Sequence, residues 1–167
     1  MNKEEVKVRL KVRLLRDEAK PPKRAHLTDA GADVFFCPDP DIKNHCRRGE
    51  GEDFWIGPRT SCLIPTGLKV EVPEGYMLEV KNRSGNAAKR SLVVGACVID
   101  SGYSGEVFVN LHNIGREPQF IQSGMKIAQL VMTPVVHFRP IETSEDIYTH
   151  PMTISTRGEG ALGSTDG

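Results

Sequence analysis

The chain has 167 residues, of which 22 are Lys or Arg and 22 are Asp or Glu, so its formal net charge is zero. This length fits one domain that buries a single core without disulfides or metals. The balanced charge excludes the broad positive field of a nucleic-acid-binding protein, so any phosphate binding has to be local.

We expect the chain to carry neither an export signal nor a membrane-spanning segment. Residues 1–10 contain no apolar run, and no stretch of 18 apolar residues occurs. The cysteines at positions 37, 46, 62 and 97 have no C-x-x-C spacing, so neither a zinc site nor a disulfide framework is indicated. We expect a soluble, reduced, cytoplasmic protein with neither nucleic acid nor a membrane as its partner.

Short strand-like runs follow one another along most of the chain. Residues 6–14 alternate apolar and basic side chains with period two, as a half-buried strand does. Further apolar runs, many of them separated by Pro or Gly, occupy residues 62–64, 68–72, 76–80, 92–94, 98–99, 107–111, 120–121 and 127–136. Only residues 85–91 could form a turn or two of helix. This density of short strands predicts an all-β sandwich or barrel in a single domain.

Three segments lack the strand pattern. Residues 38–59 form a polar, glycine-containing insertion that we interpret as a surface loop. Residues 139–156 are expected to form an extended arm that leads to a glycine-rich tail at residues 157–167. The tail contains the letters G-x-G-x-x-G, but a dinucleotide fold is excluded because that motif needs a strand before it and a helix after it.

The tail is a candidate phosphate-binding segment. Its glycines let backbone N–H groups approach phosphate oxygens, and Arg157, Ser164 and Thr165 add charge-assisted contacts. Such a tail could close over a bound polyphosphate and exclude water. Plain disorder is the alternative.

Polar residues at strand ends are further candidates for phosphate contacts. Arg83, Ser84 and Gly85 follow a strand and could hold an anion, although an ordinary polar turn has the same composition. Gln129 emerges from a strong strand, where it could donate to a phosphate or simply face solvent. Asp33 opens another strand and could support such a site or belong to a turn.

Asp100 is the strongest candidate for a catalytic residue. It directly follows the apolar pair Val98-Ile99, so we expect its carboxylate to be fixed in direction and partly desolvated, as a general base beside a water would be. A turn aspartate is the alternative, because Asp100-Ser-Gly102 also suits a hairpin. Tyr103 could form a platform for a sugar or a base, or be a half-buried strand aromatic.

Five motifs occur in order along the chain, and together they resemble those of the trimeric dUTP pyrophosphatase (dUTPase) family. That family is marked by A-G-x-D, R-S-G, G-x-I-D-x-x-Y-x-G and G-x-x-I-A-Q-L segments and by a glycine-rich C-terminal tail. The counterparts here are Ala30–Asp33, Arg83–Gly85, Val98–Gly105, Gly124–Leu130 and Arg157–Gly167. The likeness covers the chain from about residue 25 onward, except for the 38–59 insertion.

The resemblance implies a β jelly roll that forms a homotrimer with active sites at the subunit interfaces. It implies hydrolysis of dUTP to dUMP and pyrophosphate, with Asp100 activating a water for attack on the α-phosphorus. Tyr103 would pack on the deoxyribose. The backbone that would hydrogen-bond uracil belongs to Gly95, Ala96, Cys97, Val98 and Ile99.

The resemblance also implies how the triphosphate is held. The residues that would bind it or cover the base are Arg83, Ser84, Gly85, Gln129, Arg157, Leu162, Gly163, Ser164 and Thr165. Mg²⁺ would be carried by the phosphates and by water without direct protein ligands, and Asp33 would belong to the polar network near it.

Three positions depart from the family pattern. Leu162 stands where the tail usually has Phe, Ala161 replaces a tail glycine, and Cys97 replaces the glycine before the V-I-D run. Loss of the aromatic ring removes a stacking contribution of order 1 kcal/mol. We therefore expect weaker closure over the base with intact phosphate chemistry, an expectation that a tight dUTP KM would contradict.

Two alternative functions remain. dCTP deaminase shares the fold that the resemblance implies and has an I-D-x-G-[FY]-x-G segment, but deamination does not need a phosphate-closing tail. A nucleotide-sensing regulatory protein could reuse the scaffold, with the insertion contacting a partner, but a pure sensor does not need Asp100 as a base. We therefore favour the hydrolase.

Overall fold

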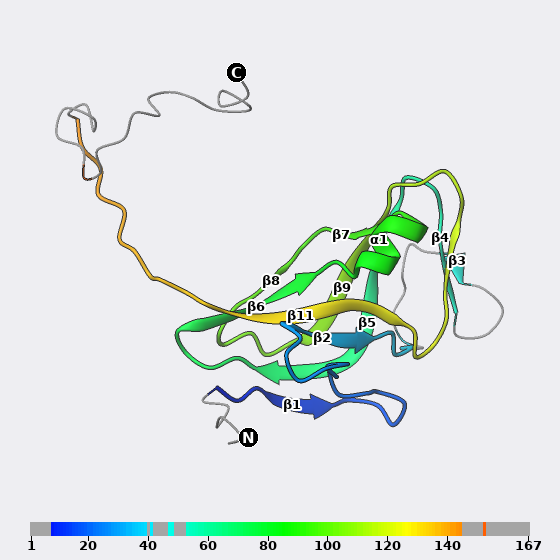
Figure 1. Ribbon diagram of the computed structural model, residues 1–167, viewed down its shortest axis with the longest axis horizontal. Helices are drawn as coiled ribbons and strands as arrows, with labels where there is room; N and C mark the ends of the chain where they lie inside the picture. The colour runs from blue at the N-terminus through cyan, green and yellow to red at the C-terminus, as the bar shows by residue number, and fades with distance from the viewer. Residues whose placement is uncertain (1–7, 40, 42–46, 49–52, 145–151, 153–167) are drawn as a thin grey trace. The chain divides into compact units, whose positions relative to one another are not determined.

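The computed structural model describes residues 8–39, 41, 47–48, 53–144 and 152. Residues up to Val136 form one compact unit, and residues from His137 onward form a second. In the second unit, residues 137–144 and 152 belong to no helix or strand. The helices and strands of the described residues all lie in the first unit (Figure 1).

Two four-stranded antiparallel sheets make up most of the first unit, which confirms the all-β prediction (Figure 1). The first sheet has the spatial order β1 (Lys11–Leu14), β5 (Ser61–Glu71), β9 (Glu106–Asn113), β7 (Leu92–Val94). The second has the order β2 (Gly31–Phe35), β11 (Lys126–Pro134), β6 (Tyr76–Lys81), β8 (Val98–Ile99). Helix α1 (Ser84–Arg90) connects β6 to β7, where the sequence allowed a short helix.

The core lies between these two sheets. Along β9, buried residues alternate with half-buried ones, so that Val107, Val109 and Leu111 all point inward. They belong to one apolar cluster with Val34 and Leu78 of the second sheet. Apolar side chains from both sheets thus share a single core, as in a sandwich.

β5 continues through Pro65 and Gly67, where the sequence predicted a break between two strands. Pro65 has no N–H for the ladder, and the pairing with β9 shifts register between Pro65 and Lys69. Gly67 has a φ of 69°, and a Cβ there would lie 2.7 Å from the Cβ of Ala19, so the position requires glycine. The Gly67 N–H donates to the Glu106 carboxylate at 2.7 Å, which attaches the irregular part of β5 to β9.

Part of the 38–59 insertion forms two strands of a small sheet, which corrects the prediction of a surface loop. The sheet has the order β10 (Gln119–Ile121), β4 (Phe54–Ile56), β3 (Arg47–Arg48). Ile56 is fully buried, and the Asn113 amide donates to its carbonyl at 3.0 Å. The rings of Trp55 and Phe120 lie 4.7 Å apart between centroids. The short apolar run Phe54–Ile56 was not predicted as a strand, because the residues around it are charged or glycine. Its partner strand β10 also lies far along the chain.

The cysteines also depart from expectation. Cys62 is disulfide-bonded, whereas Cys37 and Cys97 are free. Spacing along the chain does not show which cysteines a fold brings together, so the sequence did not predict this bond. In the part of the chain that the structure describes, no helix is both long and apolar enough to cross a membrane.

Candidate active site

Three neighbouring strands bring several predicted phosphate ligands together. Asp33 of β2 pairs with Gln129 of β11, and Gln129 pairs with Lys81 of β6. Beyond Lys81 the chain turns through Asn82 into Arg83 and α1. The Gln129 amide donates to the Asn82 carbonyl at 2.9 Å, so its side chain lies at the end of β6 where Arg83 begins the helix.

The Asp33 carboxylate accepts hydrogen bonds from two cations. One oxygen accepts from Nε of Arg83 at 2.8 Å, and the other accepts from Nζ of Lys126 at 2.8 Å. Burial alone would raise the pKa of Asp33, but the bonds from Lys126 and Arg83 outweigh it and hold that pKa below its ordinary value. Asp33 is therefore a charged centre that organises its neighbours.

Arg83 stands at the N-terminus of α1 in an extended conformation, with φ −91° and ψ 129°. Ser84 and Gly85 follow it in the first helical turn, and both are exposed. The buried Asn86 anchors the helix by donating to the carbonyls of Lys126 and Ile127 at 3.2 and 3.1 Å. The structure therefore joins Arg83, Ser84 and Gly85 to β11 in one rigid group.

The second group of predicted residues lies around the connection from β7 to β8. The Gly95 N–H donates to the Asn110 carbonyl at 2.9 Å. A Cβ on Gly95 would lie 2.3 Å from both the Asn110 amide oxygen and Nε2 of His112, so the backbone can follow this path only at glycine. The Cys97 carbonyl accepts from the Val80 N–H at 2.7 Å. This segment is thus held against β9 on one side and β6 on the other.

Ala96, Val98 and Ile99 complete that segment. The Ala96 N–H makes a long contact of 3.4 Å with the Asn110 amide oxygen. Val98 is half exposed, whereas Ile99 is buried. The strand is therefore anchored through Ile99 while its other face stays open.

Asp100 and Tyr103 share the turn that follows β8. The Tyr103 N–H donates to the Asp100 carbonyl at 3.2 Å, and the Tyr103 hydroxyl donates to the Glu106 carbonyl at 2.9 Å. Asp100 is exposed, whereas the sequence predicted a partly desolvated carboxylate. It follows the last residue of a short strand, and nothing in the described residues covers it.

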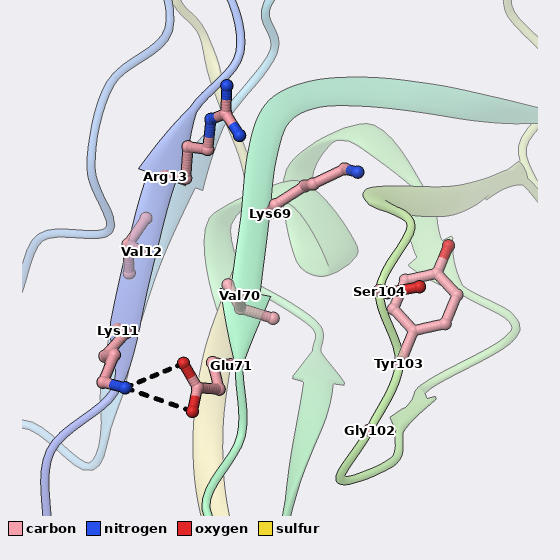
Figure 2. A pocket seen from close by; sticks show the side chains of 9 residues that line it. All are labelled: Lys11, Val12, Arg13, Lys69, Val70, Glu71, Gly102, Tyr103 and Ser104. Carbon is pink, nitrogen blue, oxygen red and sulfur yellow. Dashed lines mark hydrogen bonds and ion pairs between the residues drawn. The ribbon is translucent and has the colours of Figure 1, made fainter.

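Tyr103 also borders a groove of about 510 Å³. The other side of the groove is formed by β1 and β5, and its lining residues are Lys11, Val12, Arg13, Lys69, Val70, Glu71, Gly102, Tyr103 and Ser104. Figure 2 shows Lys69 reaching from β5 toward the turn, and the ion pair from Lys11 to Glu71 at 3.0 Å. Tyr103 therefore lines the same groove as the basic residues Lys11, Arg13 and Lys69.

The two groups of residues are separated within one chain. Ile99, the residue before Asp100, pairs with Leu78 near the start of β6, whereas Gln129 pairs with Lys81 at its end. At about 3.3 Å per strand residue, Asp100 lies roughly 13 Å along β6 from Gln129. One chain therefore carries both halves of the predicted site without bringing them together.

A sequence profile of the dUTPase family matches residues 51–165. The chain belongs to the dUTPase family. The family resemblance drawn from the five motifs is thereby confirmed.

Relatives of the dUTPase family match over nearly the whole chain. The deoxyuridine 5'-triphosphate nucleotidohydrolase of Clostridium tetani is 36% identical over 93% of this chain and 95% of its own length. The enzyme of the same name from Clostridium acetobutylicum is 38% identical over 95% of this chain and 97% of its own length.

Solved dUTPase structures share the fold. A mutant of Staphylococcus bacteriophage 80alpha dUTPase with dUpNHpp has a TM-score of 0.76 and 28% identity, and the match covers 94% of this chain and 98% of that one. A mutant dUTPase from phage phi11 of S. aureus, described with a structural Mg(II) ion, has a TM-score of 0.70 and 28% identity over 83% of this chain and 99% of that one. The jelly-roll fold expected of a dUTPase is confirmed.

Several predicted dUTPase residues lie outside the described part of the chain: Arg157, Leu162, Gly163, Ser164 and Thr165. Within the described residues, no group of three or more His, Cys, Asp or Glu side chains could hold a metal. Both oxygens of Asp33 already accept from cations.

Sequence reasoning missed four residues of the site. Lys126 lies within the G-x-x-I-A-Q-L motif, three residues before Gln129, and that spacing was a usable signal. Asn82 and Asn110 act through contacts with strands far along the chain, which the sequence alone does not reveal. Glu106 accepts from the Tyr103 hydroxyl through its backbone carbonyl, three residues along the chain.

Proposed function

We propose that the chain hydrolyses dUTP to dUMP and pyrophosphate in active sites shared between copies of the chain. This activity would keep uracil out of DNA and supply dUMP for dTMP synthesis. The observation that supports the proposal is that a member of the dUTPase family holds two separate groups of predicted site residues in place. We assign residues 95–103 as the nucleoside half of the site, and the surroundings of Arg83, Gln129 and Asp33 as its phosphate half.

In the nucleoside half, the backbone of residues 95–99 hydrogen-bonds the uracil ring. Gly95 brings this backbone close to β9, and Ile99 anchors it in the core. Tyr103 packs against the deoxyribose, leaving no room for a 2′-hydroxyl. Its ring is fixed by the bond from its hydroxyl to the Glu106 carbonyl, so the platform is preorganised for a 2′-deoxy sugar.

Asp100 supplies the base. Its carboxylate accepts a proton from a water as the water oxygen forms a bond to the α-phosphorus. The bond from the α-phosphorus to the oxygen bridging the α- and β-phosphates breaks, and its electron pair leaves with pyrophosphate. The Asp100 carboxylate is exposed at the end of β8, so it is free to contact a water. A second subunit would then enclose Asp100 and that water.

The phosphate half stabilises the negative charge that shifts onto the leaving pyrophosphate. Arg83, Ser84 and Gln129 donate to phosphate oxygens from one subunit. A Mg²⁺ held by the phosphates and water would supply further positive charge when bound. From the tail, Arg157, Ser164 and Thr165 bind the triphosphate, and Leu162 with Gly163 covers the base.

A homotrimer brings the halves together. Asp100 and Gln129 of one chain lie too far apart to act on one triphosphate, so Asp100 of one subunit works with Arg83 and Gln129 of a neighbour. Closed cyclic symmetry then forms one complete site at each interface.

The first test measures pyrophosphate release from dUTP, dCTP, dTTP and UTP with Mg²⁺, for the wild type and Asp100→Asn. Release from dUTP alone, lost in the variant, supports the hydrolase and its base. Ammonia release from dCTP would indicate a deaminase instead. Tight dUTP binding without turnover would indicate a sensor.

A second test addresses the shared site. Asp100→Asn and Arg83→Ala should each be inactive, and unfolding and refolding them together should restore activity in about a quarter of the sites, because some interfaces then combine two intact halves. If both halves came from one chain, every site would carry a defect and the mixture would stay inactive. The size of the assembly in analytical ultracentrifugation checks the trimer.

A further inference from the structure

Lys126 lies beside the predicted phosphate ligands but has no assigned part in the reaction. It begins β11, and its side chain is 44% exposed. Its ammonium group donates to Asp33 at 2.8 Å, which uses one of its three N–H donors. Two N–H donors of Lys126 therefore remain available for a ligand.

Arg83 is bound to the same carboxylate through Nε alone, at 2.8 Å. A guanidinium has five N–H donors in a planar fork, and Nε carries only one of them. The four donors on the terminal nitrogens have no partner among the described residues. The bond to Asp33 therefore fixes the plane of the guanidinium and leaves its outer edge available.

The charges of this cluster do not cancel. Arg83 and Lys126 carry two positive charges against the single negative charge of Asp33, whose side chain is only 14% exposed. Without the carboxylate, two cations side by side would repel each other and spread apart. With it, both are held in one place with a net positive charge, an arrangement that suits a multiply charged anion.

We propose that Asp33 is a positioning residue that holds Arg83 and Lys126 as a two-cation clamp, and that Lys126 is a further ligand of the terminal phosphates of the nucleotide. This inference rests on the proposed function for the identity of the nucleotide. The clamp is preorganised by Asp33, whose two oxygens each accept from one cation, so binding does not have to bring the two charges together. Gln129 pairs directly with Asp33 in the sheet, so its amide lies beside the clamp.

The test compares ligands that carry or lack the terminal phosphates. Calorimetry would measure binding of dUpNHpp, dUMP and inorganic tripolyphosphate to the wild type, Lys126→Met, Lys126→Arg and Asp33→Asn. Lys126→Met should weaken binding of dUpNHpp and tripolyphosphate by about tenfold or more, the scale of one lost charge-assisted hydrogen bond, and leave dUMP binding unchanged. Lys126→Arg should keep most of the affinity because it retains the charge.

Asp33→Asn should raise the KM for dUTP and lower kcat, because it loosens both cations. In the double variant with Lys126→Met, the losses should be less than additive, since Asp33 acts partly through Lys126. Lys89→Met is the matched control. Lys89 is exposed on α1 away from this cluster and should change none of these values. Thermal unfolding identifies any variant that fails to fold. If Lys126→Met fails to fold, the affinities of Lys126→Arg for dUpNHpp and tripolyphosphate are compared with those of the wild type instead.

The outcomes separate the clamp from the proposed reaction. Turnover of dUTP with unchanged dUpNHpp affinity in Lys126→Met would overturn the clamp and leave the hydrolase standing. Tripolyphosphate binding that depends on Lys126, without dUTP turnover, would support the clamp and overturn the hydrolase. An equal loss of dUMP and dUpNHpp binding in Lys126→Met would show a general structural defect and overturn the role at the terminal phosphates.

Discussion

The hydroxyl of Tyr103 donates to the backbone carbonyl of Glu106 at 2.9 Å. Glu106 in turn accepts from Arg16 and from the Gly67 N–H through its side chain. The orientation of the tyrosine ring thus depends on a network that crosses β9, β5 and the segment after β1. A residue proposed to select the sugar is therefore bonded to a neighbour that is itself held by contacts distant in sequence.

Tyr103→Phe removes the hydroxyl and keeps the ring. We expect kcat/KM for dUTP to fall by about fivefold, the effect of one neutral hydrogen bond of roughly 1 kcal/mol, because the ring loses its fixed orientation. The ratio of kcat/KM for dUTP to that for UTP should fall as well. Steady-state kinetics on both nucleotides checks this, and an unchanged ratio would show that the hydroxyl does not orient the ring for selectivity.

Gly105→Ala should disturb the same ring. A Cβ at this position would lie 2.4 Å from the Tyr103 hydroxyl and 2.6 Å from the ring carbon that bears it, so the ring has to move. We expect a larger loss of kcat/KM than in Tyr103→Phe. Gly57→Ala is the control, because its Cβ would meet only Thr60 at 3.5 Å. Equal kinetics in both glycine variants would contradict this prediction.

Glu106→Gln should destabilise the fold. Arg16 forms ion pairs with both Glu106 and Asp39, and its hydrogen bond to Glu106 is the main cause that raises the pKa of Arg16, since burial acts in the opposite direction. The substitution removes one charge from a largely buried pair while Asp39 still neutralises Arg16. We expect a loss of about 1–3 kcal/mol in the free energy of unfolding. Urea denaturation measures it, and no change would mean that the introduced amide keeps the full network.

The acid sensitivity of the fold should depend on Asp33. Burial opposes its charge, but Lys126 and Arg83 lower its pKa in the folded chain from the ordinary 3.8. A group whose pKa is lowered on folding stabilises the protein above its unfolded pKa, and the stabilisation is lost as the pH falls through the folded pKa. Asp33→Asn should therefore flatten the fall in stability below about pH 4. Urea denaturation at several pH values from 6 downward tests this, and an unchanged slope would contradict it.

Ile56→Ala tests whether the insertion belongs to the core. Ile56 is fully buried, so the truncation should cost about 2–5 kcal/mol in the free energy of unfolding. The neighbouring Pro58, which is exposed, offers a control in Pro58→Ala. If Ile56→Ala lowers the free energy of unfolding no more than Pro58→Ala does, the 38–59 insertion does not contribute to the core and is a surface loop.

Elements with a local signal could be predicted from the sequence alone. The short apolar run at residues 107–111 predicted a strand, and the structure shows its residues alternately buried and half-buried, because side chains of a strand point alternately to its two faces. The helix after Arg83 and the turn after Asp100 follow from their own residues. The ordered motifs also identified the family, since each motif is a short contiguous run.

Features that depend on contacts between distant residues could not be predicted from the sequence. The bonds from Lys126 and Arg83 to Asp33 join three elements, and Arg16 meets Glu106 across 90 positions of sequence. Strand register places Asp100 and Gln129 at different ends of β6, which makes a shared site necessary in the proposed reaction. Such relationships arise from strand pairing and side-chain packing, and a periodic pattern within one segment carries no information about which other segment it meets.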